Sequence, residues 1–256
     1  MTRKLWSNAT IVTTTVASLL MFAWPLIISS PGANQAGIAQ AAFIALMPVL
    51  LLVLLIEFGS GKLDSRRLAL LGLLIALNAV IRLVGAGVSG IETVFFLIIL
   101  GAFVFGAEFG FLLGTGSLLV SALLGAGVGP WLPFQMMAAG LVGLGAGLLG
   151  KGSTRRPFER TILSGYALVA SFAYGALMTM WNWPFLAGVG SSISYQPGAG
   201  LIENLQAFLR YEIFTGGLLW DLGRAVTTIV LIALTGKTLL ATLRRAANKV
   251  EFVSGD

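Results

Sequence analysis

The sequence predicts an all-α membrane protein whose helices cross the bilayer several times. Hydrophobic residues make up 57% of the chain and charged residues only 10%, and the apolar residues come in runs long enough to cross a bilayer. These runs are continuously apolar, whereas the strands of a membrane barrel alternate between apolar and polar residues. Because backbone groups in lipid must be hydrogen-bonded within the segment or within a closed barrel, we expect a polytopic bundle of helices.

Two spans are expected within residues 1–60, at roughly 8–29 and 38–56. A single polar stretch, Ser29–Gln35, interrupts an otherwise apolar and uncharged region. A cleaved signal peptide is the alternative for the first span, but the apolar run is longer than the core of ~7–15 residues that such peptides carry. We therefore treat residues 1–60 as two additional N-terminal transmembrane helices.

Six further spans are expected within residues 66–243, which we treat as a six-helix membrane core. Short polar, basic or glycine-containing connections separate most of them. The expected ranges are 68–82, 91–107, 109–124, 131–150, 161–181 and 213–236. A long connection with Gly, Ser and Pro precedes the last span, and its Glu203–Tyr211 portion could form a short interfacial helix. Residues 244–256 remain as a tail.

The distribution of Lys and Arg predicts that both termini and the tail lie in the cytoplasm. The N-terminus, the connections 57–67 and 151–160, and the C-terminal region hold 13 of the 16 basic residues. Basic residues favour the cytoplasmic side of a membrane, and eight spans return the chain to that side. This asymmetry also accounts for the net charge of +6, so the charge does not call for nucleic-acid binding.

The absence of cysteine and histidine narrows the function. It removes thiol nucleophiles, disulfides, zinc sites of the usual kind and imidazole acid–base chemistry. Catalysis is not excluded, but most routes to it are, so we expect no catalytic residues, no metal site and no enzyme activity.

Four charged residues inside the expected spans are candidates for binding a substrate. Arg82, Glu92, Asp221 and Arg224 all fall in the outward half of the expected topology. Charges in membrane helices are costly, and they usually line cavities or pair with one another. The alternative is an interhelical ion pair that only holds the bundle together.

A turn with two prolines leads into the span 131–150 and carries a second set of candidates. Proline fixes the backbone, which limits the directions of Trp131, Phe134 and Gln135. Asn182 and Trp183 are expected at the same level. Amide side chains beside aromatic rings offer a donor and an acceptor to a polar ligand, although plain anchoring at the membrane interface also explains aromatic residues.

Small residues at intervals of three or four predict close helix contacts in two spans. In 131–150 the residues are Ala139, Gly143 and Gly147, and packing within the bundle and a partner interface both remain open. In 68–82 we expect a partner-docking face, with ordinary packing as the competing explanation. That face consists of Ala69, Gly72, Ala76 and Ala79.

Five segments together carry a resemblance to a known family. They are Ser89–Thr93, Phe105–Phe111, Gly127–Met136, Trp181–Phe185 and Trp220–Ala225. With them, the region from Leu68 to Lys237 resembles the six-helix substrate-binding S-component of an energy-coupling factor (ECF) vitamin transporter, and it is most similar to the cobalamin-type members. The family's AxxxA contact maps loosely onto Gly72-x-x-x-Ala76, and the two N-terminal spans depart from the six-helix pattern.

The resemblance implies a subunit of an ABC importer in a bacterial cell membrane. Such a subunit binds a vitamin from outside, here cobalamin as the best match, and topples in the bilayer when it docks on a transmembrane coupling subunit and two cytoplasmic ATPases. It holds no permanent cofactor, and only the partner ATPases use ATP. The implied substrate-binding residues are Arg82, Glu92, Trp131, Phe134, Gln135, Asn182, Trp183, Asp221 and Arg224.

Three alternatives stay open at this point. The substrate could be another vitamin or a nucleobase-like precursor. A stand-alone secondary transporter would often show an internal repeat, and we find no convincing one. A membrane-embedded enzyme would need a catalytic constellation built from acidic residues and lysines alone.

Overall fold

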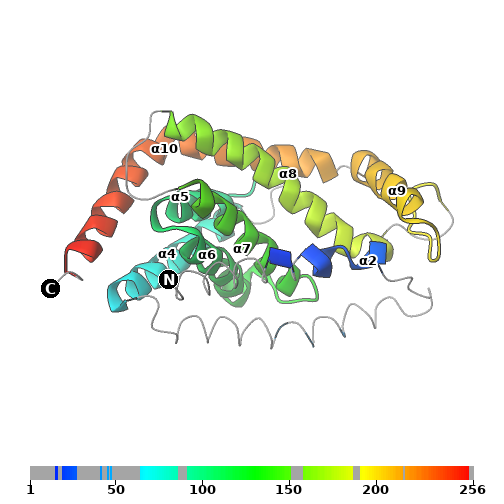
Figure 1. Ribbon diagram of the computed structural model, residues 1–256, viewed down its shortest axis with the longest axis horizontal. Coiled ribbons are helices and arrows are strands. Elements are labelled where there is room, and N and C mark those ends of the chain that lie inside the picture. The colour runs from blue at the N-terminus through cyan, green and yellow to red at the C-terminus, as the bar shows by residue number, and fades with distance from the viewer. Residues whose placement is uncertain are drawn as a thin grey trace, which may run out of the picture.

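The described part of the chain is a bundle of helices (Figure 1). The computed structural model describes residues 15–16, 19–27, 41, 45, 47, 64–85, 91–150, 158–186, 191–215 and 217–253. Every regular element among them is a helix. In order they are α2 (Trp24–Ile27), α4 (Ser65–Gly85), α5 (Val94–Phe105), α6 (Ala107–Ser121), the π-helix η1 (Ala122–Ala126), α7 (Leu132–Leu149), α8 (Glu159–Leu186), α9 (Leu201–Phe214) and α10 (Gly217–Val253).

The prediction of a polytopic helical bundle is confirmed. Among the described residues, five helices are long and apolar enough to cross a membrane: Ser65–Val84, Ala107–Ala126, Leu132–Leu149, Glu159–Phe185 and Gly217–Lys249. The expected span 38–56 lies outside the described residues apart from single positions, and only part of 8–29 is described. The number of eight spans and the cytoplasmic termini therefore stay predictions.

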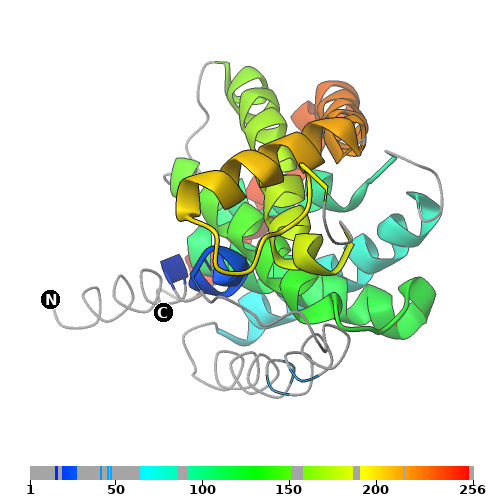
Figure 2. The same cartoon turned by 90° about the vertical axis from the view of Figure 1, so that its right-hand side faces the viewer.

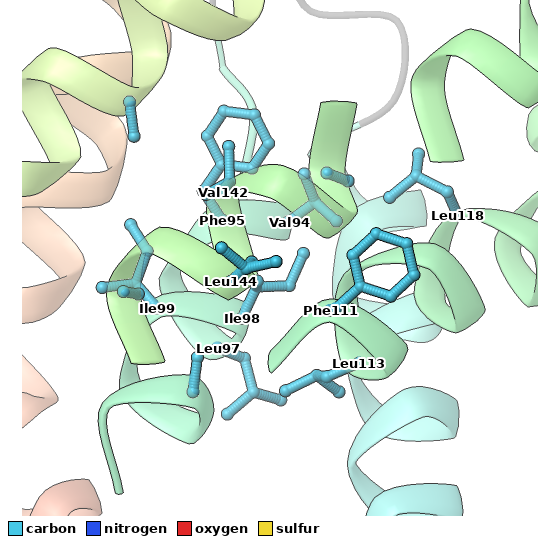
Figure 3. Close-up of a cluster of buried hydrophobic side chains, with 14 of the residues drawn as sticks. Val94, Phe95, Leu97, Ile98, Ile99, Phe111, Leu113, Leu118, Val142 and Leu144 are labelled. Carbon is cyan, nitrogen blue, oxygen red and sulfur yellow. The ribbon is translucent and has the colours of Figure 1, made fainter. Parts of the chain in front are cut away.

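Helix α5 is the centre of the bundle. Its 12 residues correspond to about 18 Å of helix, less than the ~30 Å of a bilayer core. Residues 94 to 104 are all buried, as expected for a helix that is apolar on every side. Figure 3 shows its side chains Phe95, Ile98 and Ile99 in the core, together with Phe111 of α6 and Val142 of α7.

Helices α6 and α7 pack backbone against backbone through small residues on both helices. A Cβ added at Gly143 would overlap the backbone of Gly110, and one added at Gly147 would overlap that of Gly106 and Ala107. At the other end, a Cβ on Gly114 would overlap the backbone of Ala139. The small residues of α7 therefore serve packing within the bundle, and Gly106, Gly110 and Gly114 form the matching row on α6.

Two long helices, α8 and α10, lie side by side along one edge of the bundle (Figure 1). Arg244 of α10 pairs with Glu159 at the start of α8, with 2.6 Å between Nη2 and Oε2. Helix α10 has 37 residues and continues to Val253. The basic residues expected to follow the last span therefore continue the same helix beyond 236.

The predicted interfacial helix is present and longer than expected, as α9 (Leu201–Phe214). It lies across the end of the bundle, with the α2 segment beside it (Figure 2). Its Ala207 and Phe208 face Trp183 of α8, whereas Leu201, Ile202 and Phe214 are exposed.

Candidate functional site

An ion network joins three helices at one end of the bundle. The Nε of Arg224 on α10 donates to Glu92, just before α5, over 2.7 Å, and its Nη1 donates to Asp221 over 2.5 Å. The same Nη1 donates to the backbone oxygen of Ser171 on α8 at 3.3 Å. Three of the four predicted charges therefore come together, and the guanidinium is shared between two carboxylates.

Aromatic rings and a glycine hold this network in place. The Arg224 guanidinium lies 4.8 Å from the centre of the Tyr174 ring and 5.6 Å from that of Phe95, within the range of cation–π attraction. A Cβ added at Gly175 would overlap the Asp221 carboxylate. Only glycine fits here, because Asp221 lies directly against the α8 backbone.

The fourth predicted charge, Arg82, belongs to a separate polar group. Its Nη1 donates to the hydroxyl of Ser121 on α6 at 2.8 Å, and its Nη2 donates to Oε1 of Gln135 on α7 at 3.4 Å. This arrangement joins the end of α4, the end of α6 and the start of α7. Ser121 directly precedes the π-helical turn η1, an irregularity that often marks functional sites.

The two polar groups lie at the same end of the bundle. Successive helices run in opposite directions, so the end of α4, the end of α6, the start of α7 and the start of α10 all lie at this end. Tyr174 lies between the two groups in the sense that its hydroxyl interacts electrostatically with charges of both, namely Arg82 of one group and Glu92, Asp221 and Arg224 of the other. This end faces outside in the orientation that the Lys and Arg distribution predicts.

A third acidic residue, Glu212, was not among the predicted site residues. It lies in the last turn of α9 and is buried, and neither of its carboxylate oxygens has a hydrogen-bond partner among the described residues. It lies against Gly217, one turn before Asp221 on α10, and it acts electrostatically on Asp221. Burial together with the Glu212 carboxylate raises the pKa of the neighbouring Tyr211.

An aromatic cluster connects α7, α8 and the N-terminal segment. Phe134 stacks on Trp181 with 4.0 Å between ring centres and 7° between planes. Phe22 is fully buried and meets Phe134 edge-on at 5.7 Å. Trp24 stacks on Phe185 at 5.7 Å, and its indole N–H donates to the backbone oxygen of Trp181 at 3.2 Å. Phe22 and Trp24 are therefore an integral part of this end of the bundle.

The remaining aromatic and amide candidates do not lie together in one site. Trp131 is 42% exposed, and its ring lies over Gly129. Trp183 is fully buried in a second cluster, where its indole N–H donates to the backbone oxygen of Ile193 at 2.8 Å. Asn182 is partly buried. Trp183 thus holds α9 and its preceding loop against α8. Of the three candidates Trp131, Asn182 and Trp183, only Trp131 exposes an aromatic ring at this end of the bundle.

The four residues of the expected docking face do not all lie on one surface. Ala69, Gly72 and Ala76 are exposed, and a Cβ at Gly72 would meet no atom within 4 Å. Ala79, two turns after Gly72, is fully buried. The open part of the face therefore consists of Ala69, Gly72 and Ala76, beside the exposed apolar side chains of Leu73 and Leu77.

Sequence reasoning missed several residues of this end of the bundle. Ser121 and Tyr174 are common residue types in apolar helices, and only their neighbours make them informative. Phe22 and Trp24 lie in a span that carries no polar signal. For Glu212 a signal existed, because it is an acidic residue next to the start of the last span.

Apolar helices, with buried charges and aromatic rings gathered at one end, define a multi-pass membrane protein. The family model of the ECF transporter substrate-specific component matches residues 66–243, more than half of the 256 residues. The chain belongs to this family. A comparison with curated proteins and one with solved structures gave no match.

Membership of this family defines the general role of the protein and the kind of subunits with which it associates. The family consists of transporter components, and its members associate with a transmembrane subunit and ATPase subunits. The region matched coincides with the six-helix core expected from the sequence, and the segment that carries Phe22 and Trp24 lies outside it.

Proposed function

We propose that this protein captures a vitamin, cobalamin, outside the cell and delivers it by toppling in the membrane when it docks on the coupling subunit and two ATPases. The observation that carries the proposal is the meeting of Arg82, Ser121 and Gln135 from three helices beside the exposed ring of Trp131. A few placed polar groups next to an aromatic surface suit a large amphipathic molecule better than a bare ion.

The chemistry of the side chains supports an amide-rich substrate. Gln135 can donate and accept hydrogen bonds, and the Arg82 guanidinium only donates. Cobalamin carries carboxamides around a flat apolar ring system, so its periphery suits Gln135 and Arg82 while its face suits Trp131. In this proposal the Arg224 network lies deeper, next to the site.

Binding of cobalamin without ATP is the test of the substrate. Purified protein in detergent should bind cyanocobalamin in calorimetry. Replacing Trp131 by alanine should weaken binding by about 10- to 100-fold, the usual loss for a central aromatic contact of ~1–3 kcal/mol, with little change in melting temperature because the ring is partly exposed. Gln135→Ala should also weaken binding.

The matched control is Phe158→Ala, because Phe158 is also an exposed aromatic residue but lies just before α8, at the opposite end of the bundle. Its dissociation constant should equal that of the unchanged protein. Absence of calorimetric binding by folded protein would reject cobalamin and favour another vitamin or a nucleobase-like compound. Uptake by cells that lack the ATPases would instead favour a stand-alone secondary transporter.

We further propose that the open face of α4 docks on the coupling subunit. Ala69, Gly72 and Ala76 allow close approach of another helix, because no side chain of the described residues fills the space above Gly72 and small residues let helix backbones come together.

Replacing Gly72 by leucine should separate docking from folding. The new side chain would force the two backbones apart at a cost of ~1–3 kcal/mol, which corresponds to about a 5- to 100-fold loss of affinity for the coupling subunit. Co-purification with the ATPases and vitamin uptake should fall, whereas cobalamin binding by the solitary protein should persist.

Gly165→Leu on α8 is the control for this change. Gly165 is also exposed, and a Cβ there would meet no atom within 4 Å. It should leave co-purification intact. Equal effects of the two substitutions would contradict a docking role for α4.

A further inference from the structure

The interface between α4 and α6 contains a buried amide that no group in the described part of the chain satisfies. Asn78 on α4 is 0% exposed, and neither its amide nitrogen nor its amide oxygen has a hydrogen-bond partner among the described residues. On α6, Ser117 is also 0% exposed, and its hydroxyl has no partner within the same part of the chain.

The contacts on either side place these two residues at one level of the interface. One turn toward the bundle end, Arg82 of α4 donates to Ser121 of α6. About one turn in the other direction, the side chain of Ile75 lies against Gly116, where an added Cβ would come within 2.6 Å of it. On α4, Asn78 follows Ile75 by three residues and precedes Arg82 by four, so the three side chains share one helix face. On α6, Ser117 precedes Ser121 by four residues, so these two side chains also share a face.

An unsatisfied buried amide is costly for the folded protein. An amide that leaves water without finding a partner destabilises the protein, whereas an apolar residue of similar shape is neutral or stabilising at the same place. Leucine has the same branched side-chain skeleton as asparagine and would suit the apolar surroundings of Leu74 and Ile75. Packing alone therefore gives no reason for an amide at this position.

The surroundings point to a ligand group. Asn78 lies one helical turn, about 5–6 Å, below Arg82, directly beneath the polar group that forms the proposed substrate site. The π-helix η1 begins immediately after Ser121 and contains Gly125 with φ of 128°, so the regular α-helical hydrogen bonding of α6 ends beside this position. An amide and a hydroxyl together offer two kinds of donor and two kinds of acceptor.

We propose that Asn78 and Ser117 form the inner part of the substrate site and bind a carboxamide group of the substrate. A primary carboxamide presents a carbonyl oxygen to the Asn78 NH2 and its own NH2 to the Asn78 oxygen, and the Ser117 hydroxyl completes the hydrogen bonds. The group enters along the α4–α6 interface from the Arg82 end. The inference rests on the proposed binding of an amide-rich vitamin, and it names two residues that form hydrogen bonds with a carboxamide at the edge of that vitamin.

Asn78→Leu should separate stability from binding. Because it removes the unsatisfied amide, the melting temperature of the ligand-free protein should stay the same or rise. The dissociation constant for cyanocobalamin should increase about tenfold or more, as expected when a buried hydrogen-bonding group loses its partner. Ser117→Ala, a smaller change that keeps the packing, should weaken binding in the same direction and serves if the leucine variant does not fold.

The matched control is Thr115→Val on the same helix. The Thr115 hydroxyl is buried too, but it donates to the backbone oxygen of Phe111 at 2.9 Å. This substitution should leave the dissociation constant for cyanocobalamin unchanged.

A panel of cobalamin monocarboxylic acids, each with one peripheral carboxamide converted to carboxylate, tests the chemical class. The unchanged protein should bind at least one of them about tenfold more weakly than cobalamin, because a carboxylate cannot donate to Asn78. In Asn78→Leu the preference for the carboxamide over that acid should disappear.

Four results would overturn the inference. A lower melting temperature of Asn78→Leu with unchanged binding would make Asn78 a structural residue, and a higher melting temperature with unchanged binding would mean that water occupies the position. Weaker binding with the preference intact would reject the carboxamide. Unchanged protein that binds no corrinoid would overturn the proposed substrate itself and, with it, this occupant, which is a different result from failure of the variants alone.

Discussion

Replacing Gly143 by leucine should abolish the folded protein. A Cβ at this position would overlap the backbone carbonyl of Gly110, and a backbone cannot move aside as a flexible side chain can. Overpacking a core usually costs ~1–3 kcal/mol and costs more when rigid groups collide, while total stabilities are only ~5–15 kcal/mol. We expect no monodisperse protein in size-exclusion chromatography after extraction in detergent.

The reciprocal substitution provides an internal comparison. Gly110→Leu should fail in the same way, because its Cβ would overlap the backbone of Gly143. Gly165→Leu introduces the same side chain on an exposed face of α8 and should give folded protein at the normal yield. A folded Gly143→Leu variant would show that α6 and α7 do not approach each other as closely as described.

Replacing Arg224 by leucine should have the second largest effect. The substitution leaves Glu92 and Asp221 without the guanidinium that they share, and Glu212 adds a further buried carboxylate nearby. Removing one partner from a buried ion pair typically costs ~3–5 kcal/mol, since the remaining charge is uncompensated. The melting temperature in detergent should fall steeply.

Neutralising the partners distinguishes a structural role of this network from a role in binding. The triple variant Glu92→Gln, Asp221→Asn, Arg224→Met has no buried charge at this place and should recover most of the lost stability. If it also binds cobalamin as well as the unchanged protein does, the network only holds α5, α8 and α10 together. If it is stable but does not bind, the network belongs to the substrate site.

Arg244→Met is the control for Arg224→Leu, because it breaks a different ion pair at the other end of the bundle. Arg244 pairs with Glu159 at the opposite end of α8, far from the proposed site. It should lower stability to some degree and leave ligand binding unchanged. A loss of binding in this variant would mean that any weakening of the bundle reaches the site, and the Arg224 result would then carry no information about binding.

The membrane character of this protein and the positions of its helices could be predicted from the sequence alone. Continuous apolar runs separated by basic or glycine-containing connections predicted helices close to α4, α5, α6, α7 and α8, because the demand for internal backbone hydrogen bonds acts on each segment separately. Motifs in their order also indicated the family that the match over residues 66–243 shows.

Contacts between distant segments could not be predicted in this way. Arg224 pairs with Glu92, which lies 132 residues away, and Arg82 turns instead to Ser121 and Gln135. All four charges looked equivalent in the sequence, since each is a charge in an apolar run. Which of them pair depends on how the helices are arranged around α5.

The roles of the small and aromatic residues were likewise decided by tertiary structure. The row at Ala139, Gly143 and Gly147 was visible in the sequence, but its partner could only be found when α6 placed Gly106, Gly110 and Gly114 against it. Trp183 was grouped with Phe134, yet α9 folds back over Trp183 and buries it in a separate cluster. Hydropathy acts along one segment and sets where a helix lies, whereas the partner of each side chain depends on packing between segments that are far apart in the chain.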